Sequence, residues 1–223
     1  MDHQGLLHIL SVFAFVILFL SGIIAGISLT KYKGFDYSLK VLSIYFVLAF
    51  IFEAVSLYLA RNGINNLFLF HIYAIIEFSL LVAFFSNLIY SQKARKYIYL
   101  FMILGILFLI ADSVFIQGIS VFNSYGLFFV SATVLTMSIL FFKMLLDKGA
   151  LGLSYERHKW LIFGIFITHA VSIIVLFFSN AISGFEKSNQ YILWILRSML
   201  IVVAKLIIGL AFLKNYAADR KLI

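Results

Sequence analysis

Seven stretches of consecutive apolar residues, each about 20 residues long, make up most of this chain. They cover residues 6–29, 41–60, 67–90, 97–117, 122–146, 160–179 and 191–213. A helix of about 20 apolar residues is long enough to cross the roughly 30 Å hydrocarbon core of a bilayer. The strands of a membrane β-barrel would alternate apolar and polar residues, and these stretches do not alternate. The sequence therefore predicts an all-α fold: a polytopic membrane protein whose seven-helix transmembrane bundle forms one domain, residues 1–223.

The composition excludes a soluble fold. Hydrophobic residues form 64% of the chain and charged residues 12%, whereas soluble domains are roughly half apolar and about a quarter charged. The chain contains no Cys and no Pro, which excludes disulfides, thiol catalysis and cysteine-ligated metals. In such a chain the formal net charge of +8 bears on membrane topology. We therefore expect the lipid bilayer as a partner and no nucleic acid.

The positions of Lys and Arg predict the orientation in the membrane, because cytoplasmic loops are enriched in both residues. They gather in the loops after the first, third and fifth spans and in the C-terminal tail, whereas the other loops hold only Arg61 and Lys187. We therefore expect the N-terminus outside, the C-terminus in the cytoplasm, and basic cytoplasmic loops that contact a cytoplasmic or membrane protein partner. The enriched set is Lys31, Lys33, Lys40, Lys93, Arg95, Lys96, Lys143, Lys148, Arg157, Lys159, Lys214, Arg220 and Lys221.

Polar and ionisable residues inside the spans are the strongest indication of function. A charged side chain at membrane depth costs roughly 2.5 kcal/mol or more, so it normally has a partner, a cavity or a function. The helical rise of about 1.5 Å per residue places most of these residues in the middle or the outer half of the membrane. We expect them to line a polar pocket that binds a small ligand or ion. The candidate ligand-binding residues are Glu53, His71, Tyr73, Glu77, Asp112, His169, Arg197 and Lys205.

Two of these residues share one membrane depth. Asp112 and Arg197 both fall about 7 Å outward from the midplane, which predicts a buried salt bridge between the fourth and seventh spans. On the seventh span Arg197, Ile201 and Lys205 recur at steps of four residues, so we expect them to face the bundle interior together. The long side chain of Lys205 lies within reach of the depth of Glu77.

The sequence assigns no catalytic residue, metal site or cofactor. A zinc motif such as H-E-x-x-H, a serine elbow and a phosphate-binding glycine loop are all absent. The leading hypothesis is a receptor-like or signal-relay membrane protein. Three alternatives stay open: interhelical contacts with a purely structural role, a membrane-embedded metal-dependent enzyme that acts on a lipid-like substrate, and a small transporter.

Seven spans, this length and a lysine in the last span resemble the microbial rhodopsins. In that family the last-helix lysine carries retinal and carboxylates on helix three are counterions. The resemblance implies retinal on Lys205 and a counterion role for Glu77. However, the family's arginine–aromatic–acid pattern is missing from residues 70–77, and residues 160–179 lack the proline and the set of tryptophans that enclose retinal. We therefore do not expect a rhodopsin.

A second resemblance covers about one of the seven spans. Residues 64–78, INNLFLFHIYAIIEF, are similar to segments of uncharacterised bacterial seven-span membrane proteins, some of which are associated with sensory gene sets. This resemblance brings no catalytic residues to carry over. It implies a multi-pass protein of the bacterial inner membrane with a sensory role.

Overall fold

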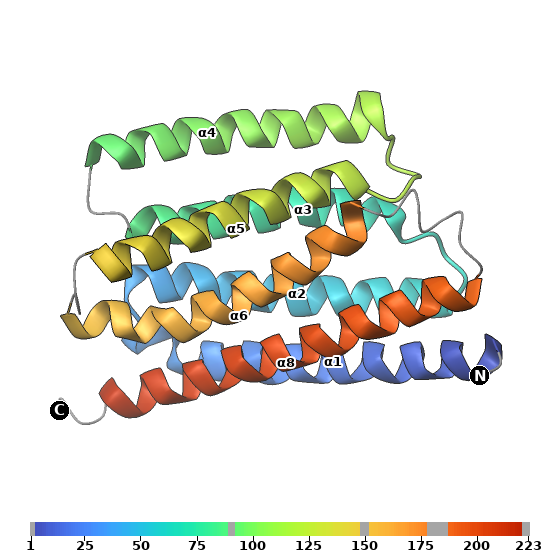
Figure 1. Cartoon of the computed structure of the whole chain (residues 1–223), viewed down its shortest axis with the longest axis horizontal. Coiled ribbons are helices and arrows are strands. Elements are labelled where there is room, and N and C mark those ends of the chain that lie inside the picture. The colour runs from blue at the N-terminus through green and yellow to red at the C-terminus, as the bar shows by residue number, and fades with distance from the viewer. Residues whose placement is uncertain (1–2, 89–91, 148–151, 178–186, 220–223) are drawn as a thin grey trace.

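A computed structural model describes residues 3–88, 92–147, 152–177 and 187–219 (Figure 1). These residues form long helices, and no strand occurs in the described ranges. The 3-10 turn η1 (Tyr32–Gly34) follows the first helix, and the π-helical turn η2 (Asp112–Ile116) follows the fourth. The helices are α1 (His3–Lys31), α2 (Tyr37–Arg61), α3 (Leu67–Leu88), α4 (Gln92–Ala111), α5 (Ser124–Asp147), α6 (Gly152–Phe177) and α8 (Lys187–Asp219).

Seven described helices are long and apolar enough to span a membrane, as the sequence predicts. Some helix ends differ from the predicted spans: α4 begins at Gln92 and α6 at Gly152, several residues before positions 97 and 160. Hydropathy marks only the part of a helix that crosses hydrocarbon, whereas the helix itself continues into the interface where Lys and Arg are solvated. The predicted span residues 89–90 and 178–179 lie outside the described residues.

The two ends of the bundle differ in charge. One end, called the lysine-rich end below, holds Lys31, Lys33, Lys93 and Lys96 and lies on the left in Figure 1. The opposite end holds the start of α1 and the connection between α4 and α5. Large apolar side chains are exposed around the outside of the bundle, including Phe19 at 69%, as expected of surfaces that face lipid.

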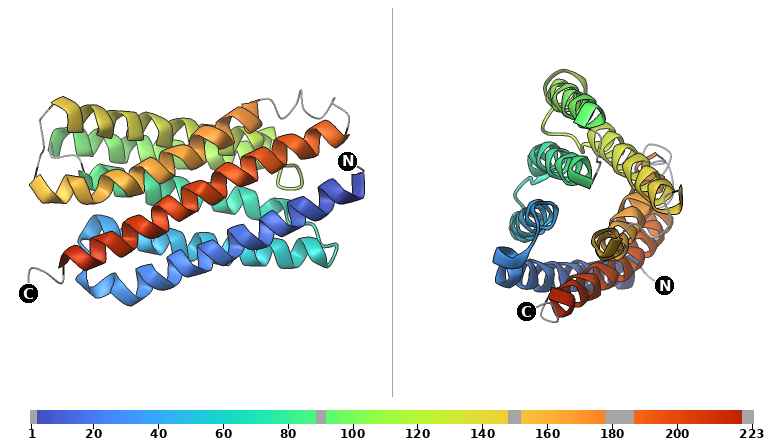
Figure 2. Two further views of the ribbon diagram at one scale, coloured as in Figure 1. Left: turned by 60° about the horizontal axis from the view of Figure 1, so that its bottom comes forward. Right: turned by 90° about the vertical axis from the view of Figure 1, so that its left-hand side faces the viewer.

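Six of the helices form a closed ring. Each packs against the next in the order α1, α2, α3, α5, α6 and α8, and α8 packs back against α1. Figure 2 shows α1 and α8 side by side, although they are the first and last described helices. Side chains from six helices therefore meet in the interior of this ring.

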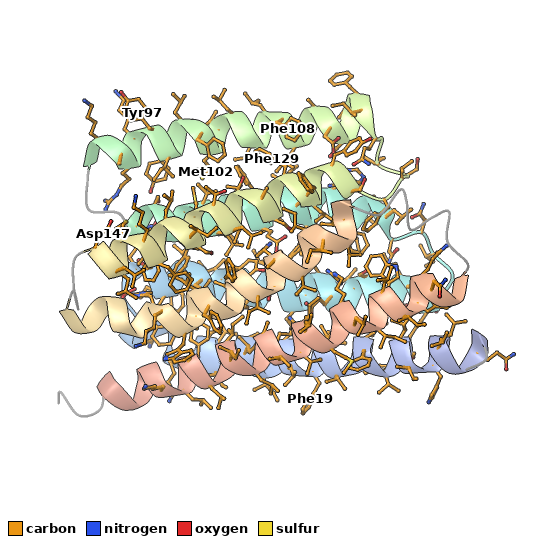
Figure 3. The ribbon with its side chains drawn as sticks, in the orientation of Figure 1. Phe19, Tyr97, Met102, Phe108, Phe129 and Asp147 are labelled. Atoms are coloured by element: carbon orange, nitrogen blue, oxygen red, sulfur yellow. The ribbon has the colours of Figure 1, made fainter. Side chains whose placement is uncertain are left out.

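Helix α4 lies outside the ring, at the edge of the bundle away from α1 and α8 (Figure 1). It packs on α3 and contacts α5 through aromatic side chains. The ring of Phe129 lies 4.8 Å from that of Phe108 and 6.2 Å from that of Phe101, measured between centroids. Figure 3 shows Phe108 and Phe129 between the two helices. Aromatic packing therefore holds much of α4 in place.

The apolar core of the ring lies mainly in the half near the lysine-rich end. On α2 the buried residues run from Ser38 to Ala49, and the residues beyond Ala49 are partly or fully exposed. Phe212 of α8 packs against Phe46 of α2 and against Phe35, with ring centroids 5.7 Å and 5.8 Å apart. The ring is therefore closely packed near the lysine-rich end and more open on α2 toward the other end.

One glycine permits the closest approach of two ring helices. At Gly164 of α6 a Cβ atom would lie 3.0 Å from the carbonyl oxygen of Ala204 on α8 and even closer to the side chain of Ile208. Gly26 of α1 differs, because a Cβ atom there would meet nothing within 4 Å. A side chain is therefore excluded at Gly164 and tolerated at Gly26.

Candidate functional site

Every helix of the ring contributes at least one polar side chain to a set of interior contacts within the apolar spans. We describe the set as the Glu77 group, the Glu53 group and the region around Arg197. The contributing residues are Ser21 of α1, Tyr45 and Glu53 of α2, Tyr73 and Glu77 of α3, Ser131 of α5, His169 and Ser172 of α6, and Arg197 and Lys205 of α8.

The Glu77 group surrounds a buried carboxylate. Oε1 of Glu77 accepts hydrogen bonds from the hydroxyls of Tyr45 at 2.8 Å and Tyr73 at 3.0 Å. Nε2 of His169 lies 3.9 Å from the same oxygen, and its Nδ1 lies 3.3 Å from Oγ of Ser131. Nε2 is buried and has no hydrogen-bond partner in the described part of the chain. Because most buried polar atoms are hydrogen-bonded, this nitrogen is a candidate contact for a ligand.

The Glu53 group joins three helices. Nζ of Lys205 lies 3.0 Å from Oε1 of Glu53. The hydroxyl of Ser21 donates to Oε2 of Glu53 and accepts a hydrogen bond from Lys205. Hydrogen bonds between ionised groups are roughly twice as strong as neutral ones, so this group is a charge-balanced contact among α1, α2 and α8.

Arg197 has weaker hydrogen-bond partners than Glu53 and Glu77. Its half-buried guanidinium donates from Nη2 to Oγ of Ser172 at 3.3 Å, and its Cζ atom lies 5.5 Å from the centroid of the Trp194 ring. Among the described residues, no carboxylate lies within 4.0 Å of it. Glu77 and Glu53 are near enough to interact with it electrostatically. A guanidinium in this environment is a candidate binding group for an anion.

The predicted salt bridge between Asp112 and Arg197 is wrong. Arg197 contacts Ser172, whereas Asp112 directly follows α4 and has no hydrogen-bond partner among the described residues. Equal depth was insufficient because α4 packs on α3 rather than beside α8. Lys205 is buried on the interior face of α8, as expected, but its partner is Glu53 rather than Glu77.

His71 and Asp112 occupy a separate place between α3 and the connection from α4 to α5. Nδ1 of His71 lies 2.9 Å from Oγ of Ser113, and its Nε2 lies 2.9 Å from the carbonyl oxygen of Val121. The structure thus brings together Glu53, Tyr73, Glu77, His169, Arg197 and Lys205 inside the ring and places His71 and Asp112 apart from them. Ligand binding by any of these residues stays a prediction.

Sequence reasoning missed four interior residues: Ser21, Tyr45, Ser131 and Ser172. All are uncharged, so they carry little of the energetic cost that singled out the ionisable residues. Helical phase could have indicated one of them, because Ser172 follows His169 by three residues and lies on the same helix face. The others depend on which helices are neighbours, which phase alone does not determine.

No three His, Asp or Glu side chains within the described ranges are close enough to hold a metal ion together. The metal-dependent enzyme hypothesis therefore gains no support from these residues. The fold and the site describe a multi-pass membrane protein with a polar, charged ring interior. Comparison with protein-family models, with curated proteins and with solved structures finds no match.

Proposed function

We propose that this chain is a receptor-like membrane protein that binds a small ligand with an anionic group inside the ring, near Arg197. One observation carries the proposal. The Arg197 guanidinium donates a hydrogen bond to a serine hydroxyl and contacts no carboxylate among the described residues. Guanidinium groups bind carboxylates and phosphates through two parallel hydrogen bonds. A charge at membrane depth is a candidate functional group by default.

The surroundings of Arg197 favour a ligand that also carries a positive group. Glu77 and Glu53 lie within electrostatic range of the guanidinium, so they would repel a purely anionic ligand. A zwitterion could place its carboxylate on Arg197 and its ammonium toward the Glu77 group. Nε2 of His169, which has no partner among the described residues, offers one more hydrogen bond. We therefore expect a small zwitterion of the amino acid type.

The packing of the ring supports binding from the end opposite the lysine-rich end. The half of α2 beyond Ala49 contains no buried residue, so α2 is less tightly packed toward the end where Arg197 lies. Toward the lysine-rich end the interior is filled by apolar side chains such as Phe46 and Phe212. This arrangement favours a site that is closed on one side over a continuous pore.

We further propose that the lysine-rich end faces the cytoplasm, which places the N-terminus outside, as expected for a protein of the bacterial inner membrane. The ligand would then reach the site from the exterior. The basic residues at the cytoplasmic end would interact with anionic lipid headgroups and with a protein partner that receives the signal. Relay would occur through rearrangement of the ring helices around the ligand.

Thermal unfolding of the purified protein in detergent tests this proposal. The probes are the free amino acids, each compared with its carboxamide, which lacks the negative charge. A ligand at about 100 times its Kd stabilises a protein by about 2.7 kcal/mol. We expect at least one amino acid to raise the Tm of the wild type, its carboxamide to have no effect, and Arg197→Gln to abolish the shift.

Arg61→Gln is the matched control, because Arg61 is an exposed arginine at the same end of the bundle. This variant should keep the full ligand response. Equal responses in Arg197→Gln and the wild type would contradict the assigned site. The absence of a shift with every amino acid would contradict the zwitterion assignment.

A further inference from the structure

Asp112 presents a buried carboxylate outside the ring. It is the first residue of η2, and its side chain is 0% exposed. Neither of its carboxylate oxygens has a hydrogen-bond partner in the part of the chain that the structure describes. An ionised carboxylate that is removed from water without a partner is strongly unfavourable, so this group requires a compensating positive charge or a proton.

Hydrogen-bond donors of the residues around η2 bond to other acceptors. The backbone N–H of Gly126 lies close to the Asp112 carboxylate but donates to Oδ1 of Asn123 at 3.0 Å. Nδ2 of Asn123 donates to the carbonyl oxygen of Phe70 at 3.4 Å. The hydroxyl of Ser113 has two acceptors within reach, the carbonyl oxygen of Leu109 at 2.8 Å and Nδ1 of His71 at 2.9 Å. The N–H of Gly126 acts on the Asp112 charge at longer range, but no donor of the described residues is in hydrogen-bonding geometry with its oxygens.

His71 is the ionisable group that acts on the charge of Asp112, but both nitrogens of its ring have other partners. Nε2 lies 2.9 Å from the carbonyl oxygen of Val121, an acceptor, so this nitrogen carries a hydrogen. Nδ1 lies 2.9 Å from Oγ of Ser113. Both ring nitrogens are therefore engaged with η2 and the following connection, and neither contacts the Asp112 oxygens directly.

The local backbone favours a binding site here. In η2 the N–H of Gln117 bonds to the carbonyl oxygen of Asp112 at 2.9 Å, five residues back. A π-helical turn of this kind is rare and often occurs at functional sites. The consecutive residues Asp112 and Ser113 of this turn both lie buried. The turn therefore keeps two consecutive oxygen-bearing side chains in the interior.

We propose that Asp112 and the oxygen atoms around η2 and the start of α5 bind a monovalent metal cation such as Na⁺. Oxygen ligands suit hard cations. A single carboxylate balances a single positive charge, and no group of three acidic or histidine ligands accompanies it within the described ranges, so the charge count favours a monovalent ion. The turn η2 leads into the connection between α4 and α5, at the end of the bundle opposite the lysine-rich end (Figure 1). This proposal does not depend on the amino acid site near Arg197.

The test measures the Tm of the purified full chain in NaCl, KCl and choline chloride at one ionic strength. We expect Na⁺ to raise the Tm of the wild type in a saturable way relative to choline. Asp112→Asn removes the uncompensated charge at nearly constant volume. It should lose the Na⁺ response and have a Tm in choline at least as high as that of the wild type. Asp36→Asn is the matched control and should respond to Na⁺ like the wild type, because Asp36 is exposed at the lysine-rich end and asparagine also caps helices.

Equilibrium dialysis of the wild type against radioactive Na⁺ provides a second measurement that does not depend on the folding of a variant. The proposal predicts one bound ion per chain. It would be overturned by the absence of saturable binding or by an equal Na⁺ response in Asp112→Asn. The proposal would also be overturned if the Tm of the wild type did not respond to Na⁺ but changed with pH, and if His71→Gln removed that pH dependence. His71 would then be the counter-charge of Asp112.

Discussion

The ammonium of Lys205 on α8 lies 3.0 Å from the carboxylate of Glu53 on α2, and Ser21 on α1 hydrogen-bonds with both groups. Lys205 and Glu53 are 152 positions apart in the chain. The contact joins three neighbouring helices of the ring through groups that would each be costly alone in the membrane. It is therefore both a structural link and the main charge compensation on this side of the ring interior.

Breaking this ion pair should destabilise the bundle. Lys205→Met or Glu53→Gln should lower the free energy of unfolding by about 2–4 kcal/mol, below the range for fully buried pairs because Glu53 is partly exposed. The double variant should recover much of the loss, with a coupling energy of about 1–3 kcal/mol. Unfolding of the four proteins in the same detergent measures the cycle. Additive losses would show that the two charges do not interact.

The two tyrosines that contact Glu77 should be energetically coupled to it. Hydrogen bonds to charged groups contribute about 1.5–3 kcal/mol, so Tyr45→Phe and Tyr73→Phe should each lower stability by about that amount. In a Glu77→Gln background each change should cost less, about 0.5–1.5 kcal/mol, because the acceptor is neutral. Tyr37→Phe is the control, since Tyr37 is 67% exposed. Equal losses in both backgrounds would argue against these bonds.

Two glycine-to-alanine changes should have opposite effects on the stability of the bundle. Gly164→Ala forces α6 away from Ala204 and Ile208 of α8, so it should destabilise the bundle by about 1–3 kcal/mol. Gly26→Ala meets open space and should stabilise α1 by roughly 0.5–1 kcal/mol through helix propensity. Thermal melts of both variants measure the difference. A stable Gly164→Ala variant would mean that the two helices do not pack as closely as described.

The proposed orientation can be measured directly because the chain contains no cysteine. Ser120→Cys lies in the exposed connection between α4 and α5, and Lys33→Cys lies in η1 at the lysine-rich end. In intact cells a membrane-impermeant maleimide should label Ser120→Cys and should label Lys33→Cys only after permeabilisation. The reverse pattern would invert the topology and place the amino acid site on the cytoplasmic side.

The membrane-spanning helices could be predicted because hydropathy and length depend only on local sequence. The positions of α2 and α3 illustrate this, since the structure begins and ends them within a few residues of the predicted spans. The start of α5 at Ser124 rather than residue 122 has a local cause: Oδ1 of Asn123 accepts the N–H of Gly126 and ends the preceding connection.

The pairing of the polar residues could be predicted only in part. Helical rise gives the depth of Asp112 and Arg197, but depth is a single coordinate and does not say which helices are neighbours. That order depends on apolar surfaces such as the aromatic contacts of Phe129 with α4. The same limit explains why Tyr45, an uncharged residue within an apolar stretch, was not recognised as a partner of Glu77.

The closure of the ring by α1 and α8 has a consequence for the biogenesis of the protein. Glu53 enters the bilayer with α2, the second described helix, whereas Lys205 arrives with the last described one. Through most of translation the acid therefore lacks its counter-charge, and only Ser21 on the preceding helix is present to bond with it. A ribosome that stalls before α8 leaves an uncompensated carboxylate among lipid tails, which marks the unfinished chain as distinct from the finished one.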